Sequence, residues 1–426
     1  MKFEFWTTPG HTHIKAILED GDSTIGTREE GAGTQIELNQ TTLTYDYEVN
    51  DIHPDILGLI CMVNFYPFIG KSVTFPFPVS ERLQAAFSIP WFHLSKRLEF
   101  NNIDRKIPKY TGNQIALSFG GGIDSTAVHK MFPEAFVVHE GHIKEGTLVN
   151  SSIHQIVNNL GPEKGRIVVS NQRYVSEPGG WHSWPCSTVT SLLLATDMNI
   201  GIILIGAPLG ATQLWKNGLR YWDRHRSRKW HGFSGSHWQS VFHSIGIPMF
   251  SPIMGTTEIQ SMRISLPSLK KDQVTYCIAN QGVECFRCTK CLRRDIIRAI
   301  VEEEYSPNWE NYNSIYIHNF LEARPLFMGH IFAYALSHSI VLPDWIESRL
   351  SDIVPIKGEW PMKIFEKTFE FCPQPWSEML RLRVLEYIEP MSEMEVNSLK
   401  QYHLTKGKIS LITRVRRMIK PDQFIR

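Results

Sequence analysis

The sequence predicts an α/β fold in which a parallel sheet carries helices on both faces, between a β-rich N-terminal module and a helical C-terminal extension. Apolar segments of strand length alternate with helix-like segments from about residue 112 to residue 206, which is typical of a parallel sheet covered on both faces. Alternating and β-branched residues fill the first 50 positions, and apolar residues at helical spacing dominate beyond about residue 300. We therefore expect an N-terminal module at 1–110, a central domain at 111–300 and an extension at 301–426.

The N-terminal module begins with four short segments that predict strands, separated by glycine-containing turns. These segments are FEFWTT, HIKAIL, TQIEL and LTYDYEV. Helices are expected over residues 55–65 and 80–87. The module contains no motif that indicates a chemistry, so it either completes the fold or binds a substrate or partner, and the first role is the more common one.

The central domain is expected to alternate four strands with three helices. The strands are predicted over 114–119, 135–139, 166–170 and 201–206, and the helices over 125–131, 147–160 and 187–198. Ligands of such sheets bind beyond the carboxyl ends of the strands. A run of glycines follows the first strand, His139 ends the second and Gly206 ends the fourth, so these residues should lie near one another.

The stretch QIALSFGGGIDST, residues 114–126, predicts an anion-binding loop. An apolar strand runs into three glycines, and an acidic residue and two hydroxyl residues then open a helix. Glycines let backbone amides approach an anion closely, and a helix N-terminus favours negative charge. Asp124 is placed either to hold a metal ion or to cap the helix. The candidate binding residues here are Ser118, Gly120, Gly121, Gly122, Asp124, Ser125 and Thr126.

This loop resembles the PP-loop, S-G-G-x-D-S, of the ATP pyrophosphatase superfamily, whose members split ATP between the α and β phosphates and leave a substrate adenylated. Four residues match the motif, whereas Gly120 replaces its first serine, and it is open whether Ser118 supplies the missing hydroxyl. No lysine follows the glycines, so this is not a Walker A loop. A glycine-rich turn without a ligand is the alternative. The resemblance implies an adenine nucleotide α-hydrolase-like fold that binds ATP and Mg²⁺, with His139 and Gly206 at the nucleotide and Asp124 and Ser125 in the chemistry.

Two loops carry aromatic side chains. The first, SEPGGWHSWPCS at 176–187, contains Trp181 and Trp184, which either stack on a flat substrate or cover the sheet edge. The second, at 215–238, interleaves arginines with tryptophans. Sites for single-stranded nucleic acid and arginine clamps on pyrophosphate both use this mixture; the small net charge and the short span favour the clamp, and a solvated loop is the simplest alternative.

Four of the seven cysteines predict a metal site. They are Cys277, Cys285, Cys288 and Cys291, in the segment CIANQGVECFRCTKC. Thiolates at C-x-x-C spacing can converge on one ion, most commonly zinc, and the basic residues Arg287, Lys290, Arg293 and Arg294 would offset their charge. An iron–sulfur cluster also accepts four cysteines, but the fourth cysteine is not followed by proline as in the usual iron–sulfur motif.

With this cluster, residues 112–300 resemble the 7-cyano-7-deazaguanine synthases and their relatives in antiviral systems. The resemblance implies a structural zinc, adenylation of a deazaguanine carboxylate, amide formation with ammonia and dehydration to a nitrile; the antiviral relatives join the heterocycle to an amine instead. This chain has Trp184-Pro185-Cys186-Ser187 where the family has Pro-Gly-Arg-Asn. A guanidinium and an amide are therefore missing from the expected substrate pocket, and adenylation is better supported than the deazaguanine substrate.

The expected activity is that of an ATP-dependent carbon–nitrogen ligase that releases AMP and pyrophosphate, with Trp184, Cys186 and Ser187 at the substrate. Ser187 would also cap the helix that follows. One alternative is an RNA-thiolating enzyme that uses Cys186, and another is a nucleotide-binding subunit without catalysis, which the Gly120 replacement favours. Position 2 is lysine rather than the cysteine of an N-terminal-nucleophile glutaminase, so the amine is free or comes from a partner.

Composition limits the remaining possibilities. The chain of 426 residues has 42% hydrophobic residues, 20% charged residues and a formal net charge of +1, which gives no general preference for nucleic acid or an acidic membrane. We expect a cytoplasmic protein without a signal peptide or membrane span. The acceptor is a small heterocycle or carboxylate, or a protein or RNA, and the oligomeric state, a homodimer included, is open. The basic tail at 406–426 either contacts RNA or an acidic partner or is a solvated helix.

Overall fold

The computed structural model of the chain describes residues 1–26, 35–36, 41–88, 98–144, 146–148, 151–177, 184–212, 214, 237–269, 274, 277, 284–324, 326–338 and 340–405. Trp181, residues 215–236 of the Arg/Trp loop and the basic tail at 406–426 lie outside the described residues, and only the backbone of Trp184 is described.

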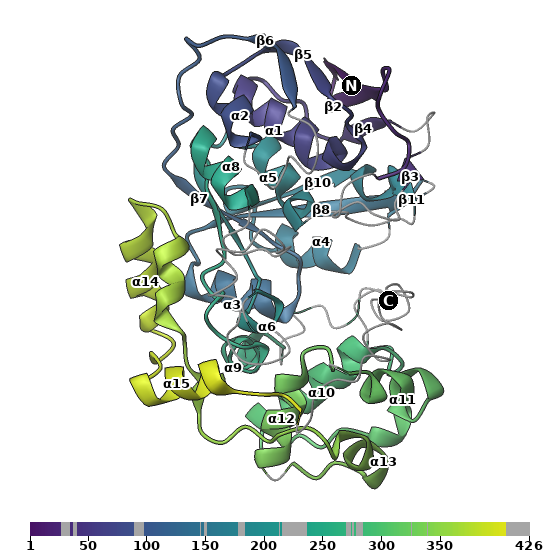
Figure 1. The fold of residues 1–426 in the computed structure, drawn as a ribbon, viewed down its shortest axis with the longest axis vertical. Helices are drawn as coiled ribbons and strands as arrows, with labels where there is room; N and C mark the ends of the chain where they lie inside the picture. Colours follow the sequence, from purple (N-terminus) through teal and green to yellow (C-terminus); the bar gives the residue numbers. More distant parts are fainter. Residues whose placement is uncertain are drawn as a thin grey trace.

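Five parallel strands form the half of the main sheet that carries the glycine loop (Figure 1). They are β7 (Gln114–Ser118), β8 (Phe136–Lys144), β10 (Gly165–Ser170), β12 (Ile200–Ile205) and β13 (Met249–Phe250). Their order across the sheet is β10-β8-β7-β12-β13, which is 3-2-1-4-5 in chain order, the order of doubly wound α/β folds. The strand order therefore reverses between β7 and β12.

The N-terminal strands continue this sheet, so the predicted parallel sheet is in fact mixed. Beyond β10 the order is β4 (Thr42–Tyr45), β2 (His11–Ile17), β1 (Lys2–Thr8), β5 (Ser72–Val79) and β6 (Glu99–Ile103). Tyr45 pairs with Ser170 in the antiparallel β4–β10 contact, which covers an edge that a five-stranded sheet would leave open. With β9 (Thr147–Leu148) on β8, this sheet has eleven strands among the described residues, and β3 (Gln35–Ile36) and β11 (Ser176–Glu177) form a separate pair.

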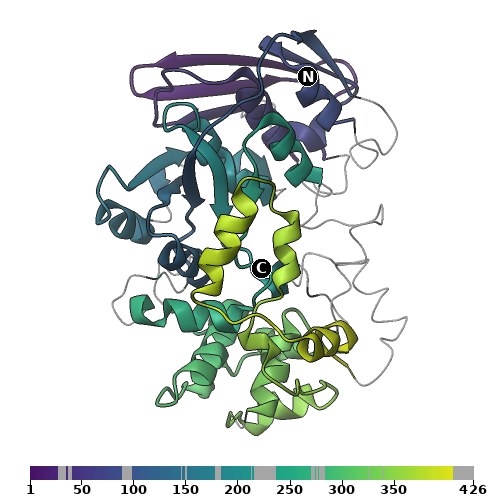
Figure 2. The same ribbon diagram turned by 90° about the vertical axis from the view of Figure 1, so that its left-hand side faces the viewer.

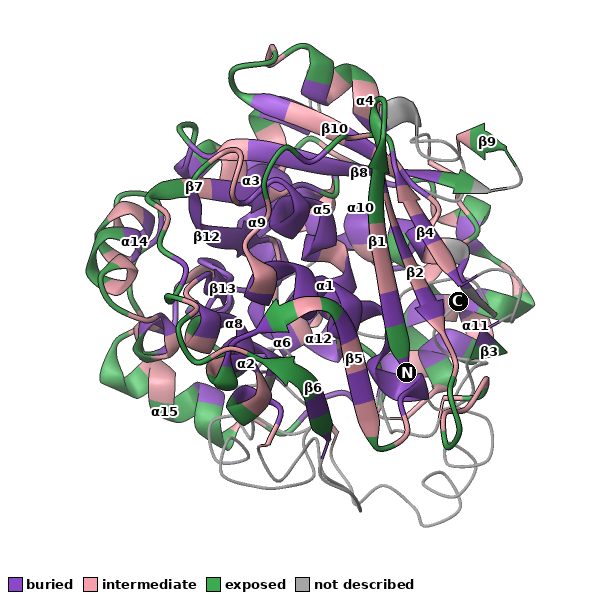
Figure 3. Ribbon diagram, turned by 90° about the horizontal axis from the view of Figure 1, so that it is seen from above, coloured by how far each residue is buried: buried purple, intermediate pink, exposed green. Residues whose placement is uncertain are grey.

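Helices cover both faces of the parallel strands, as predicted (Figure 1). Successive strand residues point to opposite faces, and accordingly Ala116 belongs to one hydrophobic core and Leu117 to another. The first core includes α1 (Pro54–Phe65), α2 (Glu81–Ala86), α5 (Val189–Leu193) and α8 (His237–Ile245). The second includes α3 (Ile123–Met131), α4 (Ser151–Asn158) and α14 (Trp376–Leu385). Helix α1 is apolar on all sides and is buried almost throughout (Figure 3).

The helices that follow β13 form a third core, which lies at the bottom of Figure 1. They are α9 (Glu258–Leu269), α10 (Thr289–Val301), α11 (Ile315–Glu322), α12 (Gly329–Ser337), α13 (Asp344–Glu347) and α15 (Glu393–Gln401). Helix α11 ends at Glu322 and α12 begins at Gly329, so they are separate helices. Between α13 and α15 the chain returns to the sheet at α14, which lies in front of the strands in Figure 2.

Short elements complete the described chain. They are α6 (Leu209–Thr212) and the 3₁₀ turns η3 (Tyr66–Phe68), η4 (Gln172–Tyr174), η5 (Trp184–Thr188), η7 (Trp309–Tyr312), η8 (Ser348–Leu350), η9 (Trp360–Met362) and η10 (Glu366–Phe371). The predicted helix over 187–198 is only the short α5 after η5, and the one over 147–160 starts as β9. No helix among the described residues combines the length and apolarity that crossing a membrane requires.

Candidate functional site

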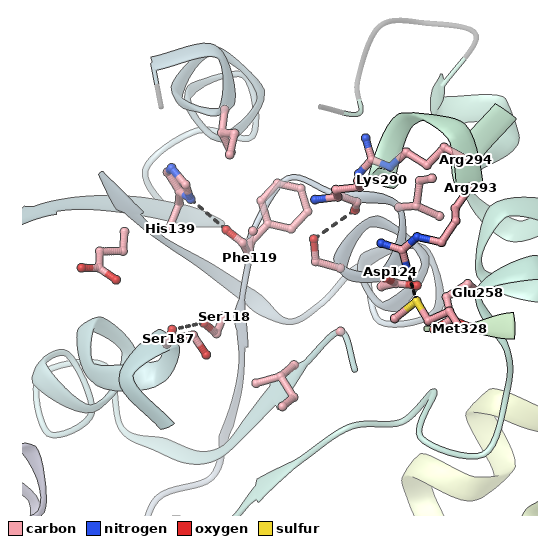
Figure 4. Close-up of a pocket in the computed structure, with 18 of the residues that line it drawn as sticks. Ser118, Phe119, Asp124, His139, Ser187, Glu258, Lys290, Arg293, Arg294 and Met328 are labelled. Atoms are coloured by element: carbon pink, nitrogen blue, oxygen red, sulfur yellow. Dashed lines mark hydrogen bonds between the residues drawn. The ribbon is translucent and has the colours of Figure 1, made fainter. Parts of the chain in front are cut away.

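A cavity of about 410 Å³ lies at the carboxyl ends of β7, β8 and β12, where the strand order reverses. This is the place where doubly wound sheets bind ligands. Figure 4 shows His139 and Ser187 on one side of Phe119, and Asp124, Glu258 and the cations of α10 on the other, so we divide the polar lining residues into two groups. We call them the α10 end, which is Asp124, Glu258, Lys290, Arg293 and Arg294, and the β8 end, which is His139, Glu140, His142, Arg173 and Ser187.

The glycine loop owes its shape to two positions where a side chain would not fit. Gly121 has φ +67°, and a Cβ there would lie 2.8 Å from the Ile153 side chain. At the end of β12, a Cβ on Gly206 would lie 2.5 Å from the Ser125 nitrogen, so Gly206 lets the start of α3 pack against the strand. Gly120 differs, because no atom lies within 4 Å of the place where its Cβ would be.

Most of the predicted nucleotide residues line the cavity, but two do not. Gly121 faces Ile153, and Thr126 is buried with its hydroxyl unpaired among the described atoms. The Ser118 hydroxyl donates to the carbonyl of Ser187, so its proton is not directed at a phosphate. The residues that do line the cavity are Ser118, Gly120, Gly122, Asp124, Ser125, His139 and Gly206.

Asp124 is the second residue of α3 and does not cap it, since Gly122 is the N-cap and no side chain caps that end. Its Oδ1 atom is buried and has no hydrogen-bond partner in the described structure. Burial, followed by repulsion from Glu258, raises the pKa of Asp124 to about 7, against the opposing effects of Ser261, Arg294 and Lys290. A carboxylate held in this way is poised to bind a cation.

Three cations of α10 face Asp124 and the glycine loop (Figure 4). A Cβ on Gly122 would lie 3.4 Å from a guanidinium nitrogen of Arg294, which places that group at the entry of α3. Desolvation by the surrounding protein and repulsion from Arg294 lower the pKa of Lys290 to about 8. Arg293 donates to the Met328 sulfur and lies with its guanidinium carbon 5.0 Å from the centre of the Phe327 ring. Loop amides and three cations together suit a polyanion.

The β8 end is joined by internal hydrogen bonds. His139 donates from Nδ1 to the Phe119 carbonyl at 2.8 Å, and burial lowers the pKa of His139 to about 3. The ring is therefore neutral and a weak base, which suits binding better than proton transfer. The Ser170 hydroxyl donates to Glu140 Oε1 at 2.7 Å, and His142 Nδ1 lies 3.5 Å from the same oxygen. Arg173 of η4 brings a guanidinium to this end.

Among the described residues of the loop predicted to face the substrate, Ser187 lines the cavity. Cys186 is 2% exposed in the core around α1, where its thiol donates to the Val63 carbonyl at 3.6 Å, so its placement at the substrate was wrong. Ser187 lies in η5, and the residue before α5 is Thr188, whose hydroxyl donates to Pro185 instead of capping the helix. Trp238, at the end of the Arg/Trp loop, is 2% exposed and packs edge-on to Tyr66 and Phe87.

The four predicted cysteines converge. Their sulfur atoms all lie within 4.8 Å of one another, with Cys288 Sγ 3.4 Å from Cys291 Sγ and 4.0 Å from Cys277 Sγ. A tetrahedral zinc with bonds of about 2.3 Å would place its sulfurs about 3.8 Å apart, so the group could bind such an ion. An iron–sulfur cluster inserts iron and sulfide between its cysteines and needs a wider spacing. Hydrogen bonding from Cys291 lowers the pKa of Cys288 to about 4, toward the thiolate that binds metals.

The cysteine cluster also determines where the cavity cations lie. Cys288 is the N-cap of α10, and its sulfur accepts from the Cys291 amide at 3.4 Å. Lys290, Arg293 and Arg294 follow within two turns. The sequence suggested that these cations balance the thiolates, whereas three of the four line the cavity and only Arg287 does not.

Several cavity residues were not predicted as site residues from the sequence. Glu140 and His142 follow His139 along β8, so the end of that strand was a signal for them. Glu258 and Arg173 have no motif around them, and they reach the cavity only through the packing of α9 and η4.

Comparison with known proteins gives one match. A family of unknown function, DUF6395, matches residues 237–403, which include Glu258, the cysteine cluster and most of the C-terminal helices but not the glycine loop. No curated protein matches the chain. No solved structure matches it either.

Proposed function

We propose that this protein is an ATP-dependent ligase that adenylates a carboxylate or amide oxygen and then joins the activated group to an amine. The observation that carries the proposal is the glycine loop at the strand reversal, facing three cations of α10 across one cavity. A glycine loop alone is a weak signal, but loop amides, a helix N-terminus and convergent cations together match the charge of a triphosphate.

The phosphates belong at the α10 end in this proposal. The amides of the loop and the side chains of Lys290 and Arg294 bind the β and γ phosphates. Asp124 fits a divalent cation, because its buried Oδ1 has no partner among the described groups and a carboxylate is a ligand that Mg²⁺ prefers. Bound there, Mg²⁺ would neutralise charge between the phosphates.

The acceptor belongs at the β8 end. Arg173 can pair with its carboxylate, and Glu140 can accept a hydrogen bond from a ring N–H, which suits a small heterocyclic acid. An acceptor oxygen attacks the α-phosphorus, the bond to the β-phosphate breaks and pyrophosphate leaves. An amine then attacks the activated carbon, AMP leaves and the amine proton passes to solvent.

The test is product analysis with ATP, Mg²⁺, ammonia and a panel of heterocyclic carboxylic acids that includes a deazaguanine carboxylate. We expect AMP and pyrophosphate in equal amounts and most of that turnover lost in Asp124→Asn, which removes a charge and keeps the shape. Release of ADP and phosphate would contradict the proposal, and binding of ATP without any turnover would favour a non-catalytic subunit.

The sulfur-transfer alternative needs a thiol at the cavity. No cysteine lines it among the described residues, and Cys186 is buried in the core. We therefore expect Cys186→Ser to retain AMP release with the best acid of the panel. RNA-dependent turnover that this substitution abolishes would reinstate thiolation.

A further inference from the structure

Glu258 is a buried carboxylate that uses only part of its bonding capacity. It is the first residue of α9 and is 7% exposed, and it lines the α10 end of the cavity. Its Oε2 accepts a hydrogen bond from Nε2 of His330, which is 3% exposed, at 2.7 Å. Its Oε1 is buried without a hydrogen-bond partner in the described part of the chain. Leaving a charged acceptor unpaired in the interior is costly unless a ligand completes it.

The fold holds Glu258 beside Asp124. The Ser265 hydroxyl of α9 donates to the Ile123 carbonyl at 2.7 Å and ties α9 to the start of α3. Gly210 permits the approach from the other side, because a Cβ there would lie 2.5 Å from Glu258 Oε1 and 2.4 Å from the His330 ring. Two carboxylates that each have one unpartnered oxygen among the described atoms, Asp124 and Glu258, therefore line the same cavity.

Arg293 is a cation that could form an ion pair with Glu258, but its hydrogen bonds go to other groups. Its guanidinium donates to the Met328 sulfur and, through Nε, to the Thr289 carbonyl at 3.2 Å. Glu258 has its ion pair with His330, and none with Arg293 occurs within 4.0 Å in the described structure. The carboxylate pair is thus left facing the cavity.

We propose that Glu258 is a second protein ligand, with Asp124, of a divalent cation that enters with the nucleotide. Mg²⁺ is usually held by one or two carboxylates, phosphate oxygens and waters, so two carboxylates at a triphosphate site complete a familiar ligand set. His330 is a positioning residue: it holds Oε2 and so fixes the orientation of the carboxylate. Because His330 lies in α12, the C-terminal region contributes directly to the site. This inference rests on the proposed nucleotide site.

The first test measures Mn²⁺ binding without turnover. Mn²⁺ is titrated by electron paramagnetic resonance with and without α,β-methylene-ATP, in the wild type, Glu258→Gln, His330→Gln and Glu359→Gln. Glu359 also pairs with a histidine, His338, at 3.2 Å, but lies outside the cavity, so Glu359→Gln is the matched control. We expect Glu258→Gln to weaken Mn²⁺ binding about tenfold or more and His330→Gln to weaken it less, with Glu359→Gln unchanged.

The outcomes separate this inference from the proposed function. If Glu258→Gln binds Mn²⁺ like the wild type while AMP release occurs, the metal ligand is wrong and the ligase stands. If Mn²⁺ binding depends on Glu258 but no substrate gives AMP, the metal site stands and the ligase fails.

A second test needs no substitution, in case Glu258→Gln does not fold. Fe²⁺ replaces Mg²⁺ in the wild type, and ascorbate with peroxide then cleaves the backbone near the bound iron. We expect cuts near residues 124 and 258 that excess Mg²⁺ suppresses, whereas any cuts near the cysteine cluster should persist. Suppressible cleavage near 124 but not near 258 would overturn the proposal.

Discussion

The two ends of the cavity are built in opposite ways. At the β8 end the polar groups bind one another: Ser118 to Ser187, His139 to Phe119 and Ser170 to Glu140. At the α10 end two carboxylate oxygens, on Asp124 and Glu258, have no partner among the described residues, and three cations crowd beside them. The first end is held by hydrogen bonds within the protein, whereas the second has carboxylate oxygens that a bound cation could complete.

The origin of the residues differs in the same way. The β8 end comes from strands of the central sheet and the turns that follow them. The α10 end collects residues from α3, α9 and α10, and its carboxylate Glu258 is held by His330 from α12. Substitutions in the C-terminal helices, remote from the glycine loop, should therefore weaken the binding of the ATP phosphates more than the binding of the acceptor acid.

The largest effect should come from the cysteine cluster. Cys288→Ser removes one sulfur of the four-cysteine group but leaves a hydroxyl that can still cap α10, so we expect loss of most of about one equivalent of zinc and, through the loss of the metal, of ATP binding at the α10 end. Metal analysis and ATP titration of the purified protein measure both. Cys372→Ser is the matched control, because this buried cysteine lies far from the cluster in sequence and in another core. Loss of zinc with ATP binding retained would show that the metal does not support the α10 end of the cavity.

Removing one positive charge at each end should affect ATP binding and acceptor binding differently. Arg294→Met should weaken ATP binding by about 1.5–3 kcal/mol, roughly ten- to a hundredfold, because a charged donor to phosphate is lost while bulk is kept. Arg173→Met should leave ATP binding within about twofold and raise the KM of the acceptor acid. Calorimetry with α,β-methylene-ATP and steady-state kinetics measure the two effects. Equal losses of ATP affinity in both variants would mean that the ends are not distinct.

Features contained in one short segment could be predicted from the sequence, whereas features that depend on packing between segments could not. The glycine loop and the cysteines were predicted because each lies in one short segment whose spacing implies its geometry. The direction of Lys290 and Arg294 could not be predicted, since it depends on how α10 packs against α3. Glu258 had no signal at all, because it comes near Asp124 through the packing of α9 against α3, in which the Ser265 hydroxyl donates to the Ile123 carbonyl.

Other misses arose from orientation. Cys186 looked reactive beside two tryptophans, but its side chain points into the core around α1, which a loop sequence does not reveal. The alternating N-terminal segments correctly predicted strands. The pairing of β4 with β10 at Tyr45 and Ser170 joins strands far apart in the sequence. Local alternation does not specify which strands pair.

The two ends should respond to pH with opposite sign. Asp124 has its pKa raised to about 7, so the folded chain holds a proton that the unfolded chain releases between about pH 4 and pH 7. Its contribution to the free energy of unfolding therefore falls as pH rises. Without divalent cations, Asp124→Asn should gain stability relative to the wild type from pH 5 to pH 8, by on the order of 1–3 kcal/mol.

His139 supplies the opposite case. Its pKa is lowered to about 3, so below about pH 6.5 the unfolded chain takes up a proton that the folded chain excludes, and stability falls as pH falls. His139→Gln retains a donor for the Phe119 carbonyl. Its free energy of unfolding should therefore rise relative to that of the wild type as the pH falls from 7 to 5. Denaturant melts of both variants across pH 5–8 measure the two slopes. Slopes of the same sign would contradict the contrast between the ends.

The smallest effect is expected at Gly120, which lies on the loop between the two ends. No atom lies within 4 Å of the position of its Cβ, so Gly120→Ser should change the free energy of unfolding by no more than about 0.5 kcal/mol. The added hydroxyl occupies the place of the first serine of the PP-loop pattern, and we expect unchanged or modestly tighter ATP binding. Gly206→Ala is the contrasting variant, since its Cβ would lie 2.5 Å from the Ser125 nitrogen and must displace α3. If the wild type binds ATP without turnover and Gly120→Ser releases AMP, the missing hydroxyl is what separates this chain from an active ligase. If Gly206→Ala is as stable and as active as Gly120→Ser, the close packing of β12 against α3 is not what shapes the loop.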